Sequence, residues 1–500
     1  MMDIGSKDLI SNLPDALVCH ILSFLSTEDA ALTSVLAKRW RYLLAFVPNL
    51  DLDNASYDHP EMGSQRSLHL RQSFNVFVDR VMALQGKAPV NKFSLRCEDD
   101  YDPSRVNGWI FNVLERGVVD LDLYIEPDSD YSLPSKVLMS KTLVRLKVEG
   151  VDNFTTHVGD FCLPRLKTLY LDDVGLEDTG ASFAKLISVC HVLEELVMID
   201  VGWDFWDSCS VFNPSLKRLK ILCDSHIEMN PNSVSFDTPN LVFLDLTDKV
   251  AIKYPKANFD SLVEARLDLR TTLDQNEPAG DSADATDLFM GIRNVEILSL
   301  SGATVEVLTI CCKAIPVFNN LIQLTIETDR KRGWESLPNL LKNCPNLETL
   351  VFQGLDYKDT DGCGDEGYKF KDTNICCNQY GDICMCKPWE GTPICLTSSP
   401  VKVLKVLKFG EITNFIDFEK QLLMIKYFLE TMPNLEQVIL YYDTPFDDDM
   451  SLVSTALYML EKVASTKCKI QVVSDSTSYV HSASALFTTG LAFIKTTFPV

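Results

Sequence analysis

One short pattern of apolar and variable positions recurs along most of the chain. It consists of an aliphatic residue, two variable residues, a second aliphatic residue, one variable residue and a third aliphatic residue. Clear copies begin at Leu143, Leu166, Leu193, Leu216, Leu241, Val295, Leu321 and Leu347, and weaker copies at Val90, Val118 and Leu262. The starts are mostly 21 to 28 residues apart, with one step of 33 before Val295. Because side chains alternate between the two faces of a strand, each copy predicts a short strand with one buried face.

The period and the apolar core of this pattern match the leucine-rich repeat. Stacked repeats form one parallel sheet, and helical spacing between some copies, as at Phe183 and Leu186, predicts helices on its other side. Regular repeats carry an Asn or Cys three residues after the last core aliphatic. Here Val151, Val174 and Val201 occupy that position, so we expect no buried Asn ladder and an uneven curvature.

Residues 356–393 interrupt the repeats with an acidic, Gly-rich and Cys-rich stretch, which we expect to be a long insertion loop. The repeat pattern resumes at Leu404 and Leu435, with a helical stripe between these two copies. A second helix is expected near residues 450–464 and a strand over 469–473. The Ser/Thr-rich end of the chain predicts a disordered tail.

The first fifty residues predict three short helices rather than a repeat. Pro14 suits a first helical turn, and Ser26 suits an N-cap. Helices of about ten residues are unstable alone in water, so they must pack on one another. The surplus of large apolar residues, including Val35 and Trp40, is consistent with a surface for a partner or with a cap on the downstream domain. The pattern alone leaves both interpretations open.

Three parts of this segment, Leu13–Asp15, Ile21–Leu25 and Thr33–Arg41, together resemble an F-box in the form common in plants. The resemblance implies docking onto a Skp-type adaptor of a cullin-based ubiquitin ligase. The adaptor contacts that it implies by position are Leu13, Pro14, Ile21, Leu22, Leu25, Val35, Leu36 and Trp40. Ala37 stands where Ser or Cys is usual, and Leu44 where many relatives have a second Trp. These departures would at most weaken adaptor binding.

The region from Ile394 to Ser474 resembles the FBD module that follows the F-box and the repeats in many plant proteins. Ser399-Pro400, Lys426–Leu429 and Pro433–Glu436 carry this resemblance. The expected fold class is α/β: a three-helix F-box, then an irregular solenoid with a curved parallel sheet and helices on its convex side, then the FBD module. The expected division is F-box 1–52, linker and first helix 53–89, repeats 90–355, insertion loop 356–393, FBD module 394–474 and disordered tail 475–500.

Composition narrows the possible partners. The 500 residues carry a formal net charge of −24, which opposes binding to nucleic acid or to an anionic membrane. The sequence contains no uncharged apolar run long enough to span a bilayer. The N-terminus lacks the pattern of a secretory signal, so the sixteen cysteines predict reduced thiols and a location in the cytoplasm or the nucleus.

The variable positions of the repeats are expected on the concave face of the solenoid. The residues that we consider for target binding on this face are Arg145, Lys147, Tyr170, Arg218, Lys220 and Phe243. Such side chains are equally consistent with an ordinary solvated sheet face. The alternative is a binding surface, because solenoids present extended concave faces to their partners.

Several patterns that suggest catalysis or cofactors are present only in part. Gly362, Gly364 and Gly367 fit the spacing of a dinucleotide-binding loop, but acidic residues crowd them and no helical pattern follows. The six cysteines between positions 363 and 395 lack the spacing of ordinary zinc-ligand pairs, so we expect no metal site. The sequence has no nucleophile–base signature and no P-loop. No cofactor and no catalytic residue are therefore expected.

The favoured interpretation is a substrate-recognition subunit of an SCF-type (Skp-cullin-F-box) ubiquitin ligase. The F-box would bind the adaptor, and the repeats would hold a target protein whose identity the sequence does not reveal. Trp40 and Leu22 are the expected anchors, and Trp40→Ala should cost about 2 kcal/mol of adaptor binding. The alternatives are a repeat-based receptor for a small molecule and an F-box scaffold that acts outside any ligase.

Overall fold

The computed structural model divides the chain into two compact units, Met1–Leu241 and Val242–Val500, called here the N-terminal and the C-terminal unit. The residues that the structure describes are 13–55, 64–98, 101–126, 131–151, 154, 161–176, 180–201, 206, 208–223, 232–271, 283–327, 337–355, 394–410, 415–442, 458, 460, 464, 468–474 and 478–482. The expected insertion loop 356–393 lies outside these residues.

The N-terminal unit opens with the three short helices that the sequence predicts. These are α1 (Asp15–Leu22), α2 (Thr27–Leu32) and α3 (Trp40–Leu43), with 3-10 turns at Thr33–Val35 and Leu44–Phe46. The backbone N–H of Asp29 donates to Ser26 Oγ at 3.1 Å, so Ser26 caps α2 as expected.

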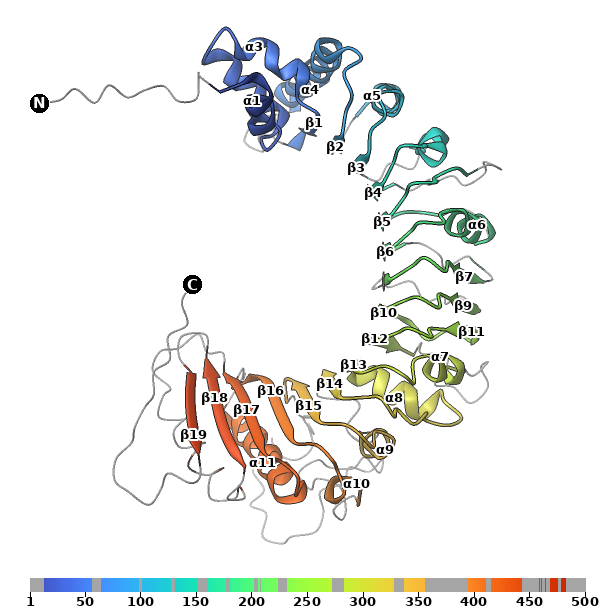
Figure 1. The fold of residues 1–500 in the computed structure, drawn as a ribbon, viewed down its shortest axis with the longest axis vertical. Helices are drawn as coiled ribbons and strands as arrows, with labels where there is room; N and C mark the ends of the chain where they lie inside the picture. Colours follow the sequence, from blue (N-terminus) through green and yellow to red (C-terminus); the bar gives the residue numbers. More distant parts are fainter. Residues whose placement is uncertain are drawn as a thin grey trace, which may run out of the picture. The chain divides into compact units, whose positions relative to one another are not determined.

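A parallel sheet follows these helices, and its strands lie in sequence order. They are β1 (Asn49–Asp53), β2 (Lys92–Cys97), β3 (Asp120–Ile125), β4 (Arg145–Glu149), β5 (Thr168–Asp172), β6 (Glu195–Ile199) and β8 (Arg218–Leu222). Three helices connect some of these strands: α4 (Ser64–Gln85), α5 (Pro103–Glu115) and α6 (Ala181–Val189). Figure 1 shows these helices on the outer side of the strands. A 3-10 helix, η4, covers Ser135–Met139.

The register of the sheet follows the repeated pattern of the sequence. The second aliphatic residues of successive copies pair with one another, as in Leu121↔Leu146, Leu146↔Leu169 and Leu169↔Leu196. These side chains are completely buried. Each strand therefore adds one layer to a continuous apolar column, which confirms the predicted leucine-rich-repeat stacking.

Two features of this unit differ from the expectation. The polar, turn-rich residues at about 55–70 predict a linker, whereas the helix α4 begins at Ser64, inside that stretch. The strand β1 falls at the end of the predicted F-box and pairs with β2 in parallel. Two further strands, β7 (Cys209–Phe212) and β9 (Ser233–Asp237), pair with each other outside the main sheet.

The C-terminal unit continues the same architecture. Its main sheet contains β10 (Phe243–Lys249), β12 (Glu264–Arg270), β13 (Ile297–Ser301), β14 (Gln323–Glu327), β15 (Thr349–Gln353), β16 (Val403–Phe409), β17 (Gln437–Tyr442), β18 (Lys469–Ser474) and β19 (Ser478–Ser482). The elements outside it are β11 (Lys253–Asn258), α7 (Thr286–Gly291), α8 (Gly302–Ile310), α9 (Leu337–Lys342), α10 (Ile394–Thr397) and α11 (Phe415–Thr431).

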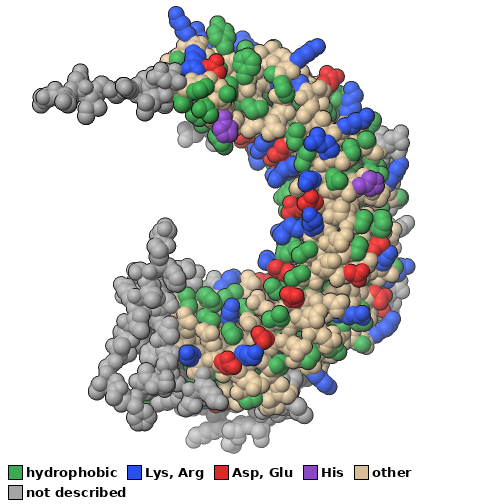
Figure 2. All heavy atoms as spheres, viewed as in Figure 1, with side chains coloured by type: hydrophobic (Ala, Val, Ile, Leu, Met, Phe, Trp, Pro, Cys, Tyr) green, Lys and Arg blue, Asp and Glu red, His purple; other side chains and the backbone are tan. Residues whose placement is uncertain are grey.

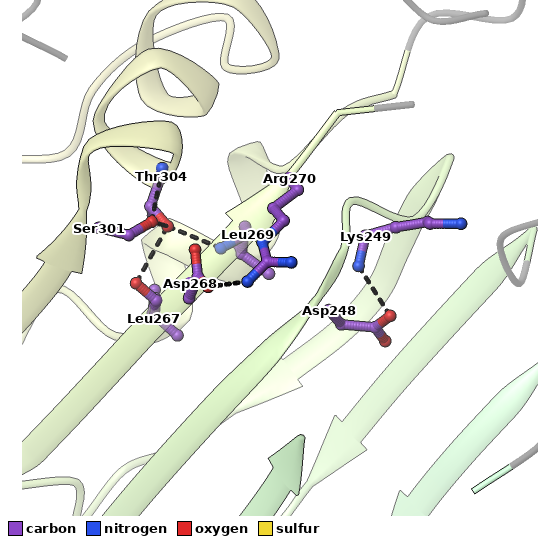
Figure 3. A network of polar contacts seen from close by, with 8 residues as sticks. All are labelled: Asp248, Lys249, Leu267, Asp268, Leu269, Arg270, Ser301 and Thr304. Atoms are coloured by element: carbon purple, nitrogen blue, oxygen red, sulfur yellow. Dashed lines mark hydrogen bonds and ion pairs between the residues drawn. The ribbon is translucent and has the colours of Figure 1, made fainter. Parts of the chain in front are cut away.

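A buried hydroxyl ties α8 to the sheet, as Figure 3 shows. Thr304 Oγ1 accepts from the backbone N–H of Leu269 at 2.7 Å and donates to the carbonyl of Leu267 at 3.0 Å. Ser301 Oγ caps the helix by accepting from the N–H of Thr304. Thr304 is completely buried, so its hydroxyl satisfies backbone groups that water does not reach.

Residues 478–482 form a strand, although they lie within the segment 475–500 that the sequence predicts to be a disordered tail. The strand β19 pairs antiparallel with β18, with Ile470 opposite His481. This pairing covers the edge that β18 would otherwise leave open. The predicted strand over 469–473 is confirmed as β18, whereas the expected helix near 450–464 lies almost entirely outside the described residues.

A ladder of polar side chains, not anticipated from the sequence, links successive repeats. It uses the residue just before the first aliphatic position, and this side chain donates to a backbone carbonyl of the preceding repeat. The pairs are Thr142 to Val118, Ser215 to Leu193, Asn240 to Pro214, Asn320 to Asn294, Asn346 to Asn319 and Asn434 to Ser399. The position where regular repeats carry Asn holds the buried valines 151, 174 and 201 instead.

Candidate functional site

The N-terminal helices form a small core of their own. Val18 and Leu22 of α1, Leu43 of α3 and Leu44 of the following 3-10 turn are buried. The guanidinium of Arg39 binds the start of α1, because its Nε donates to Asp15 Oδ1 at 2.7 Å and its Nη2 donates to the carbonyl of Leu13 at 2.5 Å. These contacts fix the positions of the first and third helices relative to each other.

Hydrogen bonds also attach these helices to the first repeats. The N–H of Asp51 in β1 donates to Thr27 Oγ1 at 2.8 Å. The buried Gln85 of α4 donates to the carbonyls of Leu44 and Val47 at 3.3 and 3.0 Å. Arg116 donates in turn to Gln85 Oε1 at 2.6 Å. The helices are therefore built onto the sheet of the N-terminal unit and are not tethered to it only by a linker.

Many large apolar side chains of these helices remain exposed. They are Leu17 (50%), Ile21 (46%), Phe24 (76%), Leu25 (39%), Leu32 (66%), Val35 (80%), Leu36 (75%), Tyr42 (71%) and Phe46 (66%). Figure 2 shows hydrophobic side chains gathered over this part of the chain. We call these residues the N-terminal apolar surface. Exposed apolar groups at this density are typical of a protein–protein contact.

The structure separates the predicted adaptor contacts into exposed and buried residues. Ile21, Leu25, Val35 and Leu36 belong to the N-terminal apolar surface, Pro14 is exposed, and Leu13 and Trp40 are half-buried. Leu22 is only 1% exposed. Leu22, which the sequence predicts as an anchor, therefore packs in the core and does not belong to the N-terminal apolar surface.

The sequence reasoning missed Leu17, Phe24, Leu32, Tyr42 and Phe46. Leu17 lies four residues before Ile21, so the helical spacing that places Ile21 on the surface also identifies Leu17. Phe46 borders a depression of about 580 Å³ that Ala16, Cys19 and Leu43 also line. This depression offers a concave apolar position next to the exposed side chains.

Glu28 in α2 has an unusual environment for a carboxylate. Its Oε1 atom is buried and has no hydrogen-bond partner among the residues that the structure describes. The pKa of Glu28 is raised to about 7, chiefly by burial and in smaller part by the negative charges of Asp51, Asp53 and Asp29, while a hydrogen bond from its own backbone N–H opposes the rise. The Glu28 carboxyl is close enough to Asp51 and Asp53 of β1 to be affected by their charges. Its protonation state should therefore change the stability of the contact between α2 and β1.

The predicted target-binding cations lie on the exposed face of the strands, as expected, but each of three has an acidic neighbour. Lys147 Nζ lies 2.5 Å from Glu149 Oε1. Arg145 lies 3.9 Å from Asp120, and Arg218 lies 3.6 Å from Glu195. These positions therefore do not form a surplus of positive charge. An anionic small molecule would have to displace existing ion pairs.

The two aromatic residues of the predicted target surface, Tyr170 and Phe243, also contact charged side chains. The Tyr170 hydroxyl donates to Asp172 Oδ2 at 3.0 Å, and the Lys147 ammonium lies 5.0 Å from the centre of the Tyr170 ring. Burial raises the pKa of Tyr170, and the nearby acidic groups add to this effect. The ring of Phe243, in β10 of the C-terminal unit, lies 5.3 Å from the Arg266 guanidinium. Lys220 lies on β8, two strands beyond β5.

The described residues contain neither a cluster suited to a metal ion nor a helix suited to a membrane. No group of three His, Cys, Asp or Glu side chains there is arranged to hold a metal ion. No helix in the described part of the chain is long and apolar enough to cross a membrane. The Cys-rich stretch, for which the sequence predicts no metal, lies outside the described residues.

Comparison with known proteins identifies both parts of this architecture. A model of the F-box domain matches residues 10–51, which contain the N-terminal apolar surface. A model described as "FBD-associated F-box protein At5g56370, LRR repeats" matches residues 106–263. The class of protein is thus an F-box protein with leucine-rich repeats.

Full-length relatives agree with this class. "Putative F-box/LRR-repeat protein At3g59230" of Arabidopsis thaliana is 52% identical, over 95% of this chain and 96% of the relative. "F-box/LRR-repeat protein At4g14096" is also 52% identical, over 98% and 99%. "Putative F-box/FBD/LRR-repeat protein At3g59240" is 48% identical, over 95% and 91%. The chain belongs to this family of F-box/LRR-repeat proteins.

Proposed function

We propose that this protein is the non-catalytic substrate receptor of an SCF-type ubiquitin ligase. The observation that carries the proposal is the N-terminal apolar surface, because it lies within the segment that matches the F-box. A Skp-type adaptor would cover these side chains and connect the chain to a cullin. Residues 394–474 would add the FBD module to the repeats.

The proposed mechanism is proximity. A receptor that holds a target beside the ubiquitin-loaded enzyme raises the effective concentration of the two reactants. Such a receptor needs two binding surfaces and no catalytic group of its own. The proposal also places the protein in the cytoplasm or the nucleus, where thiols stay reduced; the cysteines that the structure describes are free.

The test compares adaptor binding by two double variants of the full-length chain. Val35 and Leu36 are exposed and outside the core, so V35A together with L36A should fold normally. We expect a Kd for a purified Skp-type adaptor at least ten times higher, about 1.4 kcal/mol, since a few apolar anchors dominate most interfaces. Val192 and Leu423 are also exposed, and V192A together with L423A serves as the matched control.

An unchanged adaptor affinity in the V35A/L36A variant would contradict the proposal. Adaptor binding without recovery of a cullin would instead support a scaffold outside any ligase. Cullin recovery is measured by co-purification from the same preparation. A small-molecule receptor would show ligand-dependent thermal stabilisation.

A further inference from the structure

The exposed strand face of the C-terminal unit contains a depression of about 470 Å³. It is formed by five strands, β10, β12, β13, β14 and β15, and we call it the β10–β15 depression. Most of its lining residues are polar or charged, among them Glu264, Arg266, Ser299, Thr325, Glu327 and Gln353. Asp245, Gln323 and Thr325 are variable positions of the repeats, which the sequence predicts on the concave face. Of the six residues considered for target binding, Phe243 is the one in this unit, and it does not line the depression.

The strand register places these side chains in rows across the sheet. Arg266 pairs with Ser299, and Ser299 pairs with Thr325, so the two hydroxyls lie side by side on neighbouring strands. In the next row Glu327 pairs with Gln353. Parallel strands hold the rows at a fixed spacing, and a fixed spacing of polar groups is suited to binding an extended peptide.

The hydrogen-bonding capacity of these rows is largely unused within the chain. The side chains of Ser299, Gln323, Thr325 and Gln353 make no hydrogen bond in the part of the chain that the structure describes. Hydroxyl and amide groups can both donate and accept. They are therefore positioned to bind the backbone and the polar side chains of a ligand.

The charges of the depression favour a cationic ligand. The lining contains four carboxylates and one guanidinium. That guanidinium, of Arg266, already lies 2.8 Å from Glu264 Oε1, and Asp268 is paired with Arg270 at 2.8 Å. Glu327 has no ion-pair partner among the described residues. A Lys or Arg side chain of a ligand would supply the missing positive charge.

We propose that the β10–β15 depression binds an extended, basic peptide segment of the target protein. Its Lys or Arg side chain pairs with Glu327, and its backbone and uncharged polar side chains bind Ser299, Gln323, Thr325 and Gln353. Five strands at about 4.8 Å spacing span about 19 Å, which accommodates about six extended residues. This inference rests on the proposed function, because it names the chemistry of the target that the receptor holds.

The test uses fluorescein-labelled octapeptide libraries and the full-length chain bound to its adaptor. One library has Lys and Arg at two central positions within a background of Ser, Thr, Asn, Gln and Gly, and the other has Asp and Glu at those positions. Fluorescence anisotropy should show at least tenfold tighter binding of the basic library at low ionic strength. This preference should shrink at 0.5 M salt because salt screens exposed charges.

Two sets of variants locate the binding site. E327Q should weaken binding of the basic library at least fivefold, and E436Q, an exposed carboxylate outside the depression, is its control. Ser299→Ala together with Thr325→Val should weaken binding even at high salt, with Thr349→Val on the same sheet as control. Equal binding of both libraries, or unaltered binding by E327Q, would overturn the inference.

The design separates this inference from the proposed function. Adaptor binding is measured on every sample and depends on the N-terminal apolar surface. Normal adaptor binding without selection of basic peptides contradicts only the inference. Selective peptide binding without adaptor binding contradicts the proposed function and leaves the depression as a peptide-binding site.

Discussion

At the scale of single residues, Glu28 makes the stability of the F-box helices depend on pH. The raised pKa means that the folded state prefers the protonated carboxyl. Stability is then full near pH 4.5 and falls as the pH rises through about 7, where the carboxyl ionises in the folded state. Ionisation places a buried negative charge near Asp51 and Asp53, and no donor in the described part of the chain binds Oε1.

We therefore predict that Glu28→Gln stabilises the protein at pH 8 and not at pH 4.5. One pKa unit corresponds to about 1.4 kcal/mol, and partial exposure to water reduces the realised effect, so we expect about 1–2 kcal/mol. Urea unfolding of wild type and variant at the two pH values measures it. Glu115→Gln in α5 changes an exposed carboxyl and is the control. A stability difference that is the same at both pH values would rule out this account.

At the scale of the repeat, the side-chain ladder predicts a modest and local contribution to stability. Asn346 Nδ2 donates to the carbonyl of Asn319 at 2.9 Å. Asn346→Ala removes this bond and should cost about 0.5–1.5 kcal/mol, the usual net value of an intramolecular hydrogen bond. Chemical denaturation measures the loss. Arg165→Ala changes the same repeat position in a copy where the structure describes no such bond, so it should be close to neutral.

The repeated elements were predictable because their pattern is carried by neighbouring residues. The strand β1 was missed although Val47, Leu50 and Leu52 fit the same pattern, since the F-box motif had already accounted for them. The strands β7 and β9 lack the repeated pattern, and their alternation of apolar and polar residues extends over only four and five residues, which is too short to identify a strand by itself.

The sequence predicts which helices and strands form the candidate sites. It does not predict, for every residue in them, whether the side chain is exposed or buried. Leu22 and Ile21 are neighbours in α1, yet one is 1% and the other 46% exposed. That difference in exposure depends on how α1 packs against α3. The position of a residue in the F-box motif does not specify this packing. Similarly, the polar rows of the β10–β15 depression arise from the register between strands, because Ser299 and Thr325 are distant in sequence.

At the scale of the whole molecule, the repeats predict that a destabilising substitution in one unit leaves the stability of the other unit almost unchanged. Each repeat contacts only its neighbours, so stability is close to a sum of local terms. Gln85 stabilises the first repeats of the N-terminal unit, and Thr304 stabilises the junction of β12 and α8 in the C-terminal unit. Gln85→Ala and Thr304→Val each leave buried backbone groups unsatisfied, at a cost of about 1–3 kcal/mol.

Hydrogen exchange followed by mass spectrometry distinguishes local from global effects. We expect Gln85→Ala to accelerate exchange in peptides from β1 to β3 and Thr304→Val to accelerate it in peptides from β12 to β14, with little change in the other set. If either variant accelerated exchange equally in both sets, the chain would unfold as one cooperative body. The adaptor-binding and peptide-binding surfaces would then be coupled through global stability. Local effects would instead mean that each surface is held by its own repeats, so that variants of one leave the other unchanged.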